Sequence, residues 1–331
     1  MTNPSTTGKP LLEIENLSVH FRQGSRVTRA VDGVSLSVGA GETVGLVGES
    51  GSGKSTIGRA IVGLVPITSG TIRFDGRDIT TANLKLRREL SAEMQVVFQD
   101  PYSSLNPAKT IGQTLAEPMT VHEKISRSDR ADRVAEMLER VGMPVDAANR
   151  YPAQFSGGQR QRIAIARALM LKPRLVICDE PVSALDLSIQ AQIMNLLADL
   201  QDELGVSYLF IAHDLAVVRH ISHRTVVLYR GQIMESGDAE AVADNPQHPY
   251  SEALVTAAPL PDPDVQRVRA RERAELLLLN GRDGDPLTSC AFASRCIYAT
   301  DVCWEHRPPL VTDASGRSVA CVRHGAAALP G

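Results

Sequence analysis

The glycine-rich segment GESGSGKS, at residues 48–55, fits the pattern G-x-x-x-x-G-K-[ST] and limits the folds open to this chain. The β-like run TVGLVG precedes it and the helix-like run STIGRAIVGL follows it, and we expect this helix to end at Pro66. Glycines let such a loop curl until its backbone N–H groups face a phosphate, Lys54 reaches the β- and γ-phosphates, and Ser55 supplies a hydroxyl to Mg²⁺. A plain Gly/Ser turn is the alternative, and the flanking strand and helix argue against it. The segment therefore predicts a site for a nucleoside triphosphate and Mg²⁺, built from Gly48, Glu49, Ser50, Gly51, Ser52, Gly53, Lys54, Ser55 and Thr56.

A second segment, LVICDEP at residues 175–181, places two carboxylates directly after a buried strand. Four apolar residues form the strand, and Asp179 emerges at its C-terminal end, where ligands of open α/β sheets bind. We expect Asp179 to position Mg²⁺ through its water shell and Glu180 to polarise an attacking water as a general base. Taken alone, this segment also fits a strand that ends in an acidic turn. The phosphate-binding segment at residues 48–55, called the P-loop below, argues against that alternative.

A third segment, FSGGQRQR at residues 155–162, begins a helix with a second anion-binding nest. Ser156, Gly157, Gly158 and Gln159 form its start. One chain cannot sensibly place two phosphate cradles on one triphosphate from the same side, whereas two subunits can hold one nucleotide between them. Taken alone, the segment also fits an ordinary Ser N-cap followed by a Gly turn.

The remaining pattern predicts an α/β fold with a mostly parallel sheet, because short apolar runs alternate with helix-like stretches. A turn-rich segment, PLPDPD, lies within the domain boundary that we expect at 258–265. The expected elements are two or three strands within 11–47, a helix-like stretch at 110–142, a helix at 159–171, a strand at 175–178, a helix at 188–204, and strands at 207–213 and 225–229.

Composition excludes several classes of protein. The 331 residues are 43% hydrophobic and 22% charged, which provides material for a core and excludes a disordered chain. The net charge of −3 argues against binding nucleic acid through a general basic field. Apolar runs fall far below the roughly 20 residues that span a bilayer, and no signal peptide is visible. We therefore expect a soluble, intracellular protein with no nucleic-acid partner.

Four of the five cysteines lie in the last part of the chain, with the spacing C-x5-C-x6-C-x17-C. In a reducing compartment this cluster indicates a metal site before it indicates disulfides. The spacing matches neither the C-x2-C pairs of zinc ribbons nor a bacterial ferredoxin run, so it leaves the metal open. Four thiolates suit a [4Fe–4S] cluster or a tetrahedral zinc, and the candidate ligands are Cys290, Cys296, Cys303 and Cys321.

The ordered set of these motifs resembles the nucleotide-binding subunits of ABC transporters over about residues 11–255. The resemblance implies an α/β, ABC-type P-loop ATPase with a RecA-like parallel-sheet core, an antiparallel β subdomain and a helical subdomain at about 100–160. It also implies a domain at 11–257, followed at 258–331 by a linker and a small cysteine-rich extension. By position, the family's roles are adenine stacking for Phe21, sensing of Mg²⁺ and the attacking water for Gln99, catalytic base for Glu180, communication across the dimer for Asp186, and contact with the γ-phosphate for His213.

Three stretches narrow the resemblance to the oligopeptide/dipeptide importers: 96–107, 150–173 and 248–259. Of the two ATPase subunits that these importers carry, the segment PYSSLNP more closely resembles the second, F-type subunit. This implies an ATPase at the cytoplasmic face of the membrane, in a heterodimer with a sister ATPase. The heterodimer would sit on two permeases, to which a substrate-binding protein delivers the cargo. Peptide is the expected cargo, and nickel, glutathione or oligosaccharide are alternatives within the same branch.

The cysteine pattern C-x-F-x-x-R-C-x-x-A-x-x-x-C, followed by V-A-C, resembles the C-terminal extension of the same importers. The resemblance favours a [4Fe–4S] cluster, with zinc or idle thiols as alternatives. Two other functions are alternatives for the whole chain. A non-transport ABC ATPase would usually carry two nucleotide modules or long insertions, and a redox-sensing regulator would make the cysteine segment its principal site.

Overall fold

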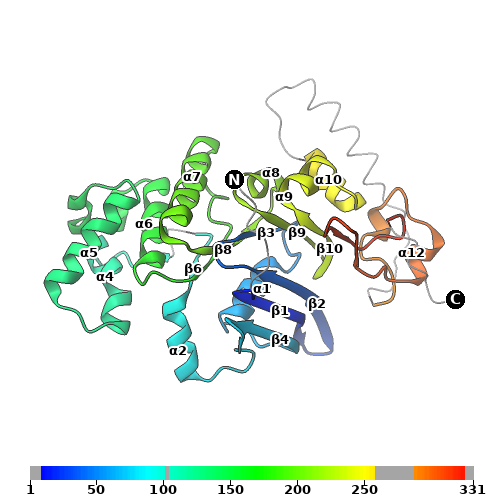
Figure 1. Cartoon of the computed structure of the whole chain (residues 1–331), viewed down its shortest axis with the longest axis horizontal. Helices are drawn as coiled ribbons and strands as arrows, with labels where there is room; N and C mark the ends of the chain where they lie inside the picture. Colours follow the sequence, from blue (N-terminus) through cyan, green and yellow to red (C-terminus); the bar gives the residue numbers. More distant parts are fainter. Residues whose placement is uncertain (1–8, 101–103, 258–286, 325–331) are drawn as a thin grey trace.

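The computed structural model describes residues 9–100, 104–257 and 287–324 (Figure 1), so the boundary expected at 258–265 lies outside the described residues. The strands are β1 (Leu12–Gln23), β2 (Arg26–Val38), β3 (Thr43–Val47), β4 (Ser69–Phe74), β5 (Arg77–Asp78), β6 (Met94–Val97), β7 (Leu175–Asp179), β8 (Ser207–Ala212), β9 (Arg224–Tyr229), β10 (Gln232–Asp238), β11 (Val311–Thr312) and β12 (Ser318–Val319). The α-helices are α1 (Lys54–Ile61), α2 (Leu84–Glu93), α4 (Ile111–His122), α5 (Arg127–Arg140), α6 (Gly157–Leu169), α7 (Leu187–Leu204), α8 (Leu215–Ile221), α9 (Ala239–Asp244), α10 (Pro249–Ala257) and α12 (Asp301–Glu305). Short 3₁₀ helices are η1 (Val145–Asn149), η2 (Pro152–Gln154) and η3 (Ala293–Arg295).

The central sheet of the described residues has the order β11-β12-β10-β9-β3-β8-β7-β6. Its middle is parallel: β3 pairs with β8 and β9, and β7 pairs with β6 and β8. Both β3 and β7 are buried along their whole length, as expected for parallel strands covered on both faces. The predicted α/β core is therefore present, and a mixed rather than purely parallel sheet completes it.

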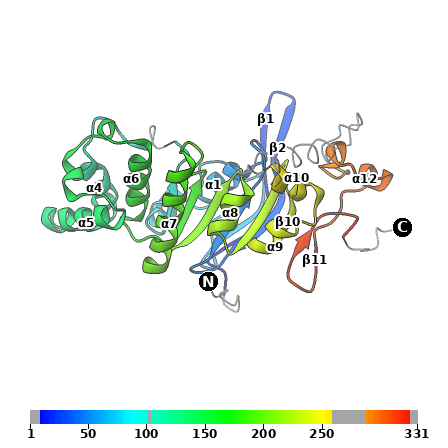
Figure 2. The same ribbon diagram turned by 90° about the horizontal axis from the view of Figure 1, so that it is seen from above.

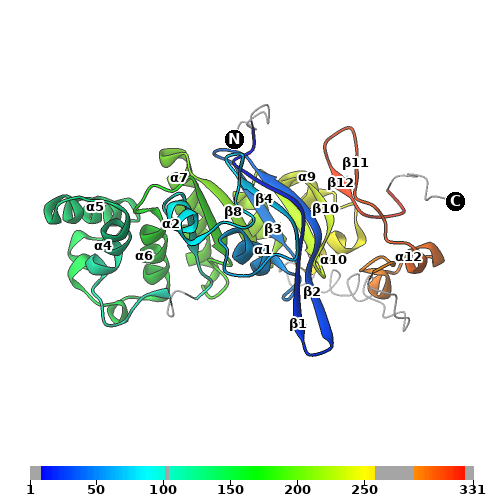
Figure 3. The ribbon, with the colours of Figure 1, turned by 90° about the horizontal axis from the view of Figure 1, so that it is seen from below.

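A separate antiparallel sheet, in the order β2-β1-β4-β5, packs against one face of the central sheet. Alternate residues of β3 point to opposite faces of the central sheet, and each face packs into a different hydrophobic core. Val44 and Leu46 pack with α1 and the antiparallel sheet, whereas Val47 packs with the core that includes α6, α7 and α8. Figures 2 and 3 show β1 and β2 projecting together as a long hairpin beyond the layers.

Two helix predictions need correction. The stretch 110–142 forms two helices, α4 and α5, because Ser126 begins a new helix by accepting a hydrogen bond from the backbone N–H of Asp129 at 3.1 Å. Helix α1 ends at Ile61 and not at Pro66, because Gly63 follows with a φ of +76°, a left-handed conformation that ends an α-helix. In the part of the chain that the structure describes, no helix is long and apolar enough to cross a membrane.

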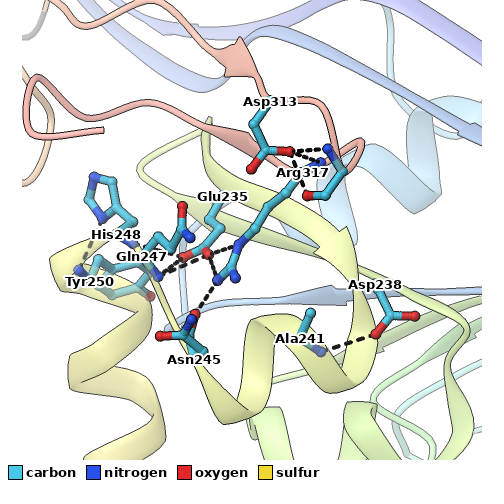
Figure 4. Close-up of polar contacts among 10 residues, drawn as sticks. Glu235, Asp238, Ala241, Asn245, Gln247, His248, Tyr250, Asp313 and Arg317 are labelled. Carbon is cyan, nitrogen blue, oxygen red and sulfur yellow. Dashed lines mark hydrogen bonds and ion pairs between the residues drawn. The ribbon is translucent and has the colours of Figure 1, made fainter. Parts of the chain in front are cut away.

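The C-terminal extension, described here from residue 287 to 324, is built onto the central sheet. Strand β12 pairs with β10, with Val319 opposite Glu235. Figure 4 shows the buried ion pair that accompanies this pairing: Arg317 Nε donates to Glu235 Oε1 at 2.8 Å, and the guanidinium also reaches the carbonyl of Asn245. Glu235 is fully buried, and its carboxylate also accepts from the backbone N–H of His248 at 2.9 Å. The extension is thus attached to the core by a ladder and by a buried charge pair.

Candidate functional site

The loop between β3 and α1 holds the first predicted motif, and its glycines are required by close packing. A Cβ at Gly48 would come within 2.1 Å of the carbonyl oxygen of Leu228 in β9. A Cβ at Gly53, whose φ is +105°, would come within 2.2 Å of the carbonyl oxygen of Ala30 in β2. Only glycine fits at both positions, so the two strands fix the curl that turns the loop into the start of α1.

Lys54 is held inside this loop by backbone carbonyls. Its Nζ donates to Gly48 O at 2.7 Å and to Glu49 O at 2.9 Å, and the residue is only 4% exposed. Burial lowers the pKa of Lys54, while the carboxylates of Glu180 and Asp179 oppose that shift. The ammonium of a lysine that follows such a glycine-rich loop is the group that reaches the phosphates of a nucleotide.

Ser55 and Asp179 meet where α1 begins and β7 ends. Ser55 Oγ donates to Asp179 Oδ1 at 2.7 Å, across 124 residues of sequence. A hydroxyl and a carboxylate are hard oxygen ligands of the kind that Mg²⁺ accepts, so these two residues fit the metal expected here. Gln99, also expected at the metal, instead donates its amide to Glu180 in this structure.

Glu180 lines an open pocket of about 530 Å³. Its Oε2 accepts from Gln99 Nε2 at 2.8 Å and lies 4.0 Å from His213 Nδ1. Gln99 and Glu180, predicted to act on the attacking water, and His213, predicted to contact the γ-phosphate, therefore lie together. Glu180 has a φ of +48°, a conformation that non-glycine residues rarely adopt and that is often found at functional sites. The pocket is lined by Ser50, Gln99, Asp100, Glu180, Ser183, Ala184 and His213.

The second predicted cradle, Ser156 to Gln159, does not line this pocket. It begins α6, where Ser156 Oγ accepts from Gln159 N–H at 3.3 Å and the Gln159 side chain accepts from Ser156 N–H at 3.0 Å. Gly158 packs close to Ile189 of α7, since a Cβ there would come within 2.6 Å of Ile189 Cγ2. Asp186 caps α7 by accepting from the same Ile189 N–H at 3.0 Å. Within one chain, this segment and Asp186 are neighbours of each other.

Phe21, the residue expected to stack on adenine, lies in β1 opposite Thr28 of β2. It is 42% exposed, so its ring is accessible to a planar ligand. Thr28 lines a second pocket of about 680 Å³, to which Gly51 also contributes.

Two residues that the sequence reasoning did not assign also contact the loop. The backbone N–H of Glu49 donates to Tyr250 Oη at 2.8 Å, and both oxygens of its carboxylate accept from Arg295 at 2.7 and 2.8 Å. Tyr250 lies in the stretch 248–259 and Arg295 in the cysteine pattern, so each was within a recognised motif. Neither motif indicates that its residue folds back onto position 49.

The four C-terminal cysteines line one cavity of about 20 Å³, together with His248 and Phe292. Backbone groups of residues 292, 298 and 323 hydrogen-bond three of the thiols, those of Cys290, Cys296 and Cys321. Burial raises the pKa of Cys290 to about 12 and that of Cys296 to about 11. Within the described ranges, no three His, Cys, Asp or Glu side chains are arranged to hold a single metal ion. Cys178, the fifth cysteine, is fully buried in β7.

Comparison with known proteins agrees with this geometry. Residues 31–183 match the family described as ABC transporter, and residues 234–303 match the family described as oligopeptide/dipeptide transporter, C-terminal region. The oligopeptide transport ATP-binding protein OppF of Salmonella typhimurium is 49% identical over 329 residues, covering 95% of this chain and 96% of its own. OppF of Escherichia coli is 48% identical over 336 residues, covering 97% and 98%.

Solved structures show the same fold. The cbiO1 protein of Clostridium perfringens, part of the ABC transporter complex cbiONQ, aligns with a TM-score of 0.65 and 29% identity, over 72% of this chain and 92% of its own. A dimeric ATP-binding cassette in a post-hydrolysis state, bound to ADP and Pi, aligns with a TM-score of 0.63 and 30% identity, over 69% and 98%.

Proposed function

The chain belongs to the ABC transporter family, and we propose that it is the F-type ATP-hydrolysing subunit that powers import of di- and oligopeptides. The observation that supports ATP hydrolysis is the 2.7 Å hydrogen bond between Ser55 and Asp179, beside the buried Lys54. Relatives named for oligopeptide transport or peptide import, alike over nearly the whole chain, support the cargo.

In the proposed reaction, water attacks the γ-phosphorus and the bond to the β-phosphate oxygen breaks, which releases ADP and phosphate. Lys54 binds the β- and γ-phosphates, and Ser55 and Asp179 would hold Mg²⁺, which would neutralise phosphate charge when bound. Glu180 takes the proton of the attacking water. Gln99, already bonded to Glu180, orients that water, and His213 contacts the γ-phosphate.

We propose that the site is completed by a second ATPase subunit. The Ser156–Gln159 segment lies outside the pocket of its own chain, which supports its use by the partner's nucleotide. Asp186, adjacent to that segment, would report the state of one site to the other, and Phe21 would stack on adenine. The dimeric arrangement of a structural relative supports the same assembly.

The further partners follow from the importer family. We propose a heterodimer with a sister ATPase, placed on two permeases at the cytoplasmic face of the membrane, with a binding protein that delivers peptide. The nucleotide-binding domain would span residues 11–257, with its helical part at about 100–160, and the cysteine-rich extension would lie within 258–331.

We propose that the C-terminal extension binds a metal cofactor through its four cysteines. Four cysteines around one cavity, three of them hydrogen-bonded by backbone groups, support a [4Fe–4S] cluster held by Cys290, Cys296, Cys303 and Cys321. The cavity of about 20 Å³ admits about one water-sized body, so binding a cluster would require the thiols to move apart. A single zinc ion finds no ready ligand set among the described side chains.

Affinity purification of the tagged chain from membranes tests the assembly. Recovery of two permeases and a sister ATPase, with ATPase activity that the added peptide-loaded binding protein stimulates, is the expected result. Recovery of the chain with nucleic-acid-processing proteins, or ATPase activity indifferent to peptide, would contradict the proposal.

A further inference from the structure

The C-terminal extension reaches back to the P-loop through Arg295. Its two terminal nitrogens donate to the two carboxylate oxygens of Glu49 at 2.7 and 2.8 Å, across 246 residues of sequence. We propose that Arg295 is a positioning residue that holds Glu49, so that the P-loop's affinity for ATP depends on the folded state of the cysteine-lined extension. This inference rests on the proposed function of the P-loop as the ATP site.

The contact has the geometry of a strong ion pair. Both N–H groups of the planar guanidinium meet both oxygens of one carboxylate, and such bidentate, charge-assisted pairs are stronger and more directional than single contacts. The Arg295 side chain is 22% exposed and that of Glu49 is 41% exposed, so water screens the pair mainly from the Glu49 side. Lysine at this position could supply one donor but not the fork.

Glu49 is the point where this contact acts on the nucleotide site. Its carbonyl oxygen accepts from Lys54 Nζ at 2.9 Å and from Ser52 N–H at 3.1 Å, so it orients the phosphate-binding lysine and the turn of the loop. Its backbone N–H donates to Tyr250 Oη at 2.8 Å. A displacement of Glu49 would therefore move the carbonyl that holds Lys54.

Within the C-terminal extension, the position of Arg295 is set by residues next to the cysteines. It ends η3 directly before Cys296, and its guanidinium lies 5.7 Å from the ring centroids of both Tyr229 and Phe292. Phe292 is fully buried, and its backbone hydrogen-bonds the thiol of Cys290. The cavity of the cysteines and the carboxylate of Glu49 are thus joined through four consecutive residues, 292–295.

A pocket provides an independent sign that the extension adjoins the loop. Gly51 of the P-loop and Trp304 of α12 line the same pocket of about 680 Å³. Coupling between two sites is reciprocal, so a nucleotide that gains affinity from an ordered extension must also stabilise that extension.

The first test measures equilibrium binding of Mg-ATP to the full-length chain, by dialysis, for wild type, Arg295→Ala, Arg295→Lys and Arg307→Ala. Arg307 is the control for a general loosening of the extension: it joins the extension to Asp32, through Oδ2 at 2.8 Å and the backbone oxygen at 3.1 Å, and not to Glu49. We expect Arg295→Ala to weaken binding about 5-fold or more, Arg295→Lys to weaken it less, and Arg307→Ala to stay within about 2-fold. In the assembled transporter, Arg295→Ala should raise the KM for ATP more than it lowers kcat.

The second test uses Trp304, the single tryptophan of the chain, as a probe of the extension during urea unfolding. Mg-ATP should raise the unfolding midpoint of the wild-type extension and should raise that of Arg295→Ala much less. If Arg295→Ala does not fold, which its Trp304 emission would reveal, Arg295→Lys is judged on the same criteria.

The outcomes separate this inference from the proposed function. Wild-type protein that does not bind Mg-ATP would overturn both. Wild-type protein that binds, together with Arg295 variants that bind as tightly and gain the same protection at Trp304, would overturn the inference alone.

Discussion

Gln99 Nε2 donates a 2.8 Å hydrogen bond to Glu180 Oε2, which joins the residues that follow two neighbouring parallel strands. Gln99 comes two residues after β6, and Glu180 directly follows β7. Because the carboxyl ends of parallel strands meet at one edge of a sheet, the pairing of β6 with β7 is what brings this amide to the proposed catalytic base.

Replacement of that base should separate binding from hydrolysis. Glu180→Gln keeps the shape of the side chain but cannot accept the proton of the attacking water, so we expect ATP binding to persist while turnover falls about 10²–10⁴-fold. Single-turnover hydrolysis by the assembled complex measures this, with Glu240→Gln on the exposed part of α9 as the control. Near-normal turnover in Glu180→Gln would remove Glu180 from the role of base.

Removal of the loop lysine should abolish binding. Lys54→Ala deletes the buried ammonium that the carbonyls of Gly48 and Glu49 orient, and no other lysine contacts these carbonyls among the described residues. Binding of a fluorescent ATP analogue checks this against Lys85→Ala, an exposed lysine of α2. Tight binding by a folded Lys54→Ala protein would contradict the P-loop assignment.

Glycine at position 53 should be required for stability as well as for binding. In Gly53→Ala the new Cβ would meet the Ala30 carbonyl at 2.2 Å in addition to adopting a positive φ. Gly205→Ala is the matched control, because Gly205 also has a positive φ but has no heavy atom within 4 Å of the added Cβ. We expect a cost of about 1–2 kcal/mol in the free energy of unfolding for the control and about 3 kcal/mol or more for Gly53→Ala. Equal losses in urea unfolding would show that the close contact with β2 does not matter.

Local patterns in the sequence predicted much of the site, whereas the attachment of the extension could not be read from them. The strand that ends at Asp179 and the loop that ends at Ser55 each have a strong local pattern, and their meeting follows from parallel-sheet topology. The end of α1 at Ile61 and the break between α4 and α5 before Ser126 are not visible in the sequence pattern. The spacing of apolar residues continues across a helix end of only a few residues, so periodicity does not mark it. The pairing of β12 with β10 and the contact of Arg295 with Glu49 depend on partners 82 or more residues away, for which local periodicity gives no signal.

The buried pair between Arg317 and Glu235 offers a test of how the extension is attached (Figure 4). Arg317→Met leaves a fully buried carboxylate without its guanidinium, and we expect a loss of about 3–5 kcal/mol in the stability of the extension. The double variant Arg317→Met with Glu235→Gln removes both charges, keeps an oxygen that accepts from the backbone N–H of His248, and should recover much of that loss. Urea unfolding followed through Trp304 measures both. A double variant no more stable than Arg317→Met would show that lost packing, and not the unpaired charge, causes the effect.

Metal analysis tests the proposed cluster. Anaerobic purification should yield a coloured protein with about four irons per chain, and Cys303→Ser should lose most of that iron. Cys178→Ala is the control, because Cys178 lies in β7 away from the cavity of the four cysteines. One zinc per chain would make the segment a structural clip, and a metal-free protein would show that these cysteines hold no metal cofactor.

ATP-driven uptake of a labelled oligopeptide by proteoliposomes that contain the whole transporter tests whether this ATP site powers import. We expect uptake with wild-type subunit and internal ATP, and none when this subunit carries Glu180→Gln, although the same vesicles still bind ATP. Peptide uptake that continues at the wild-type rate with Glu180→Gln would show that the site built from Lys54, Ser55, Asp179 and Glu180 does not power import.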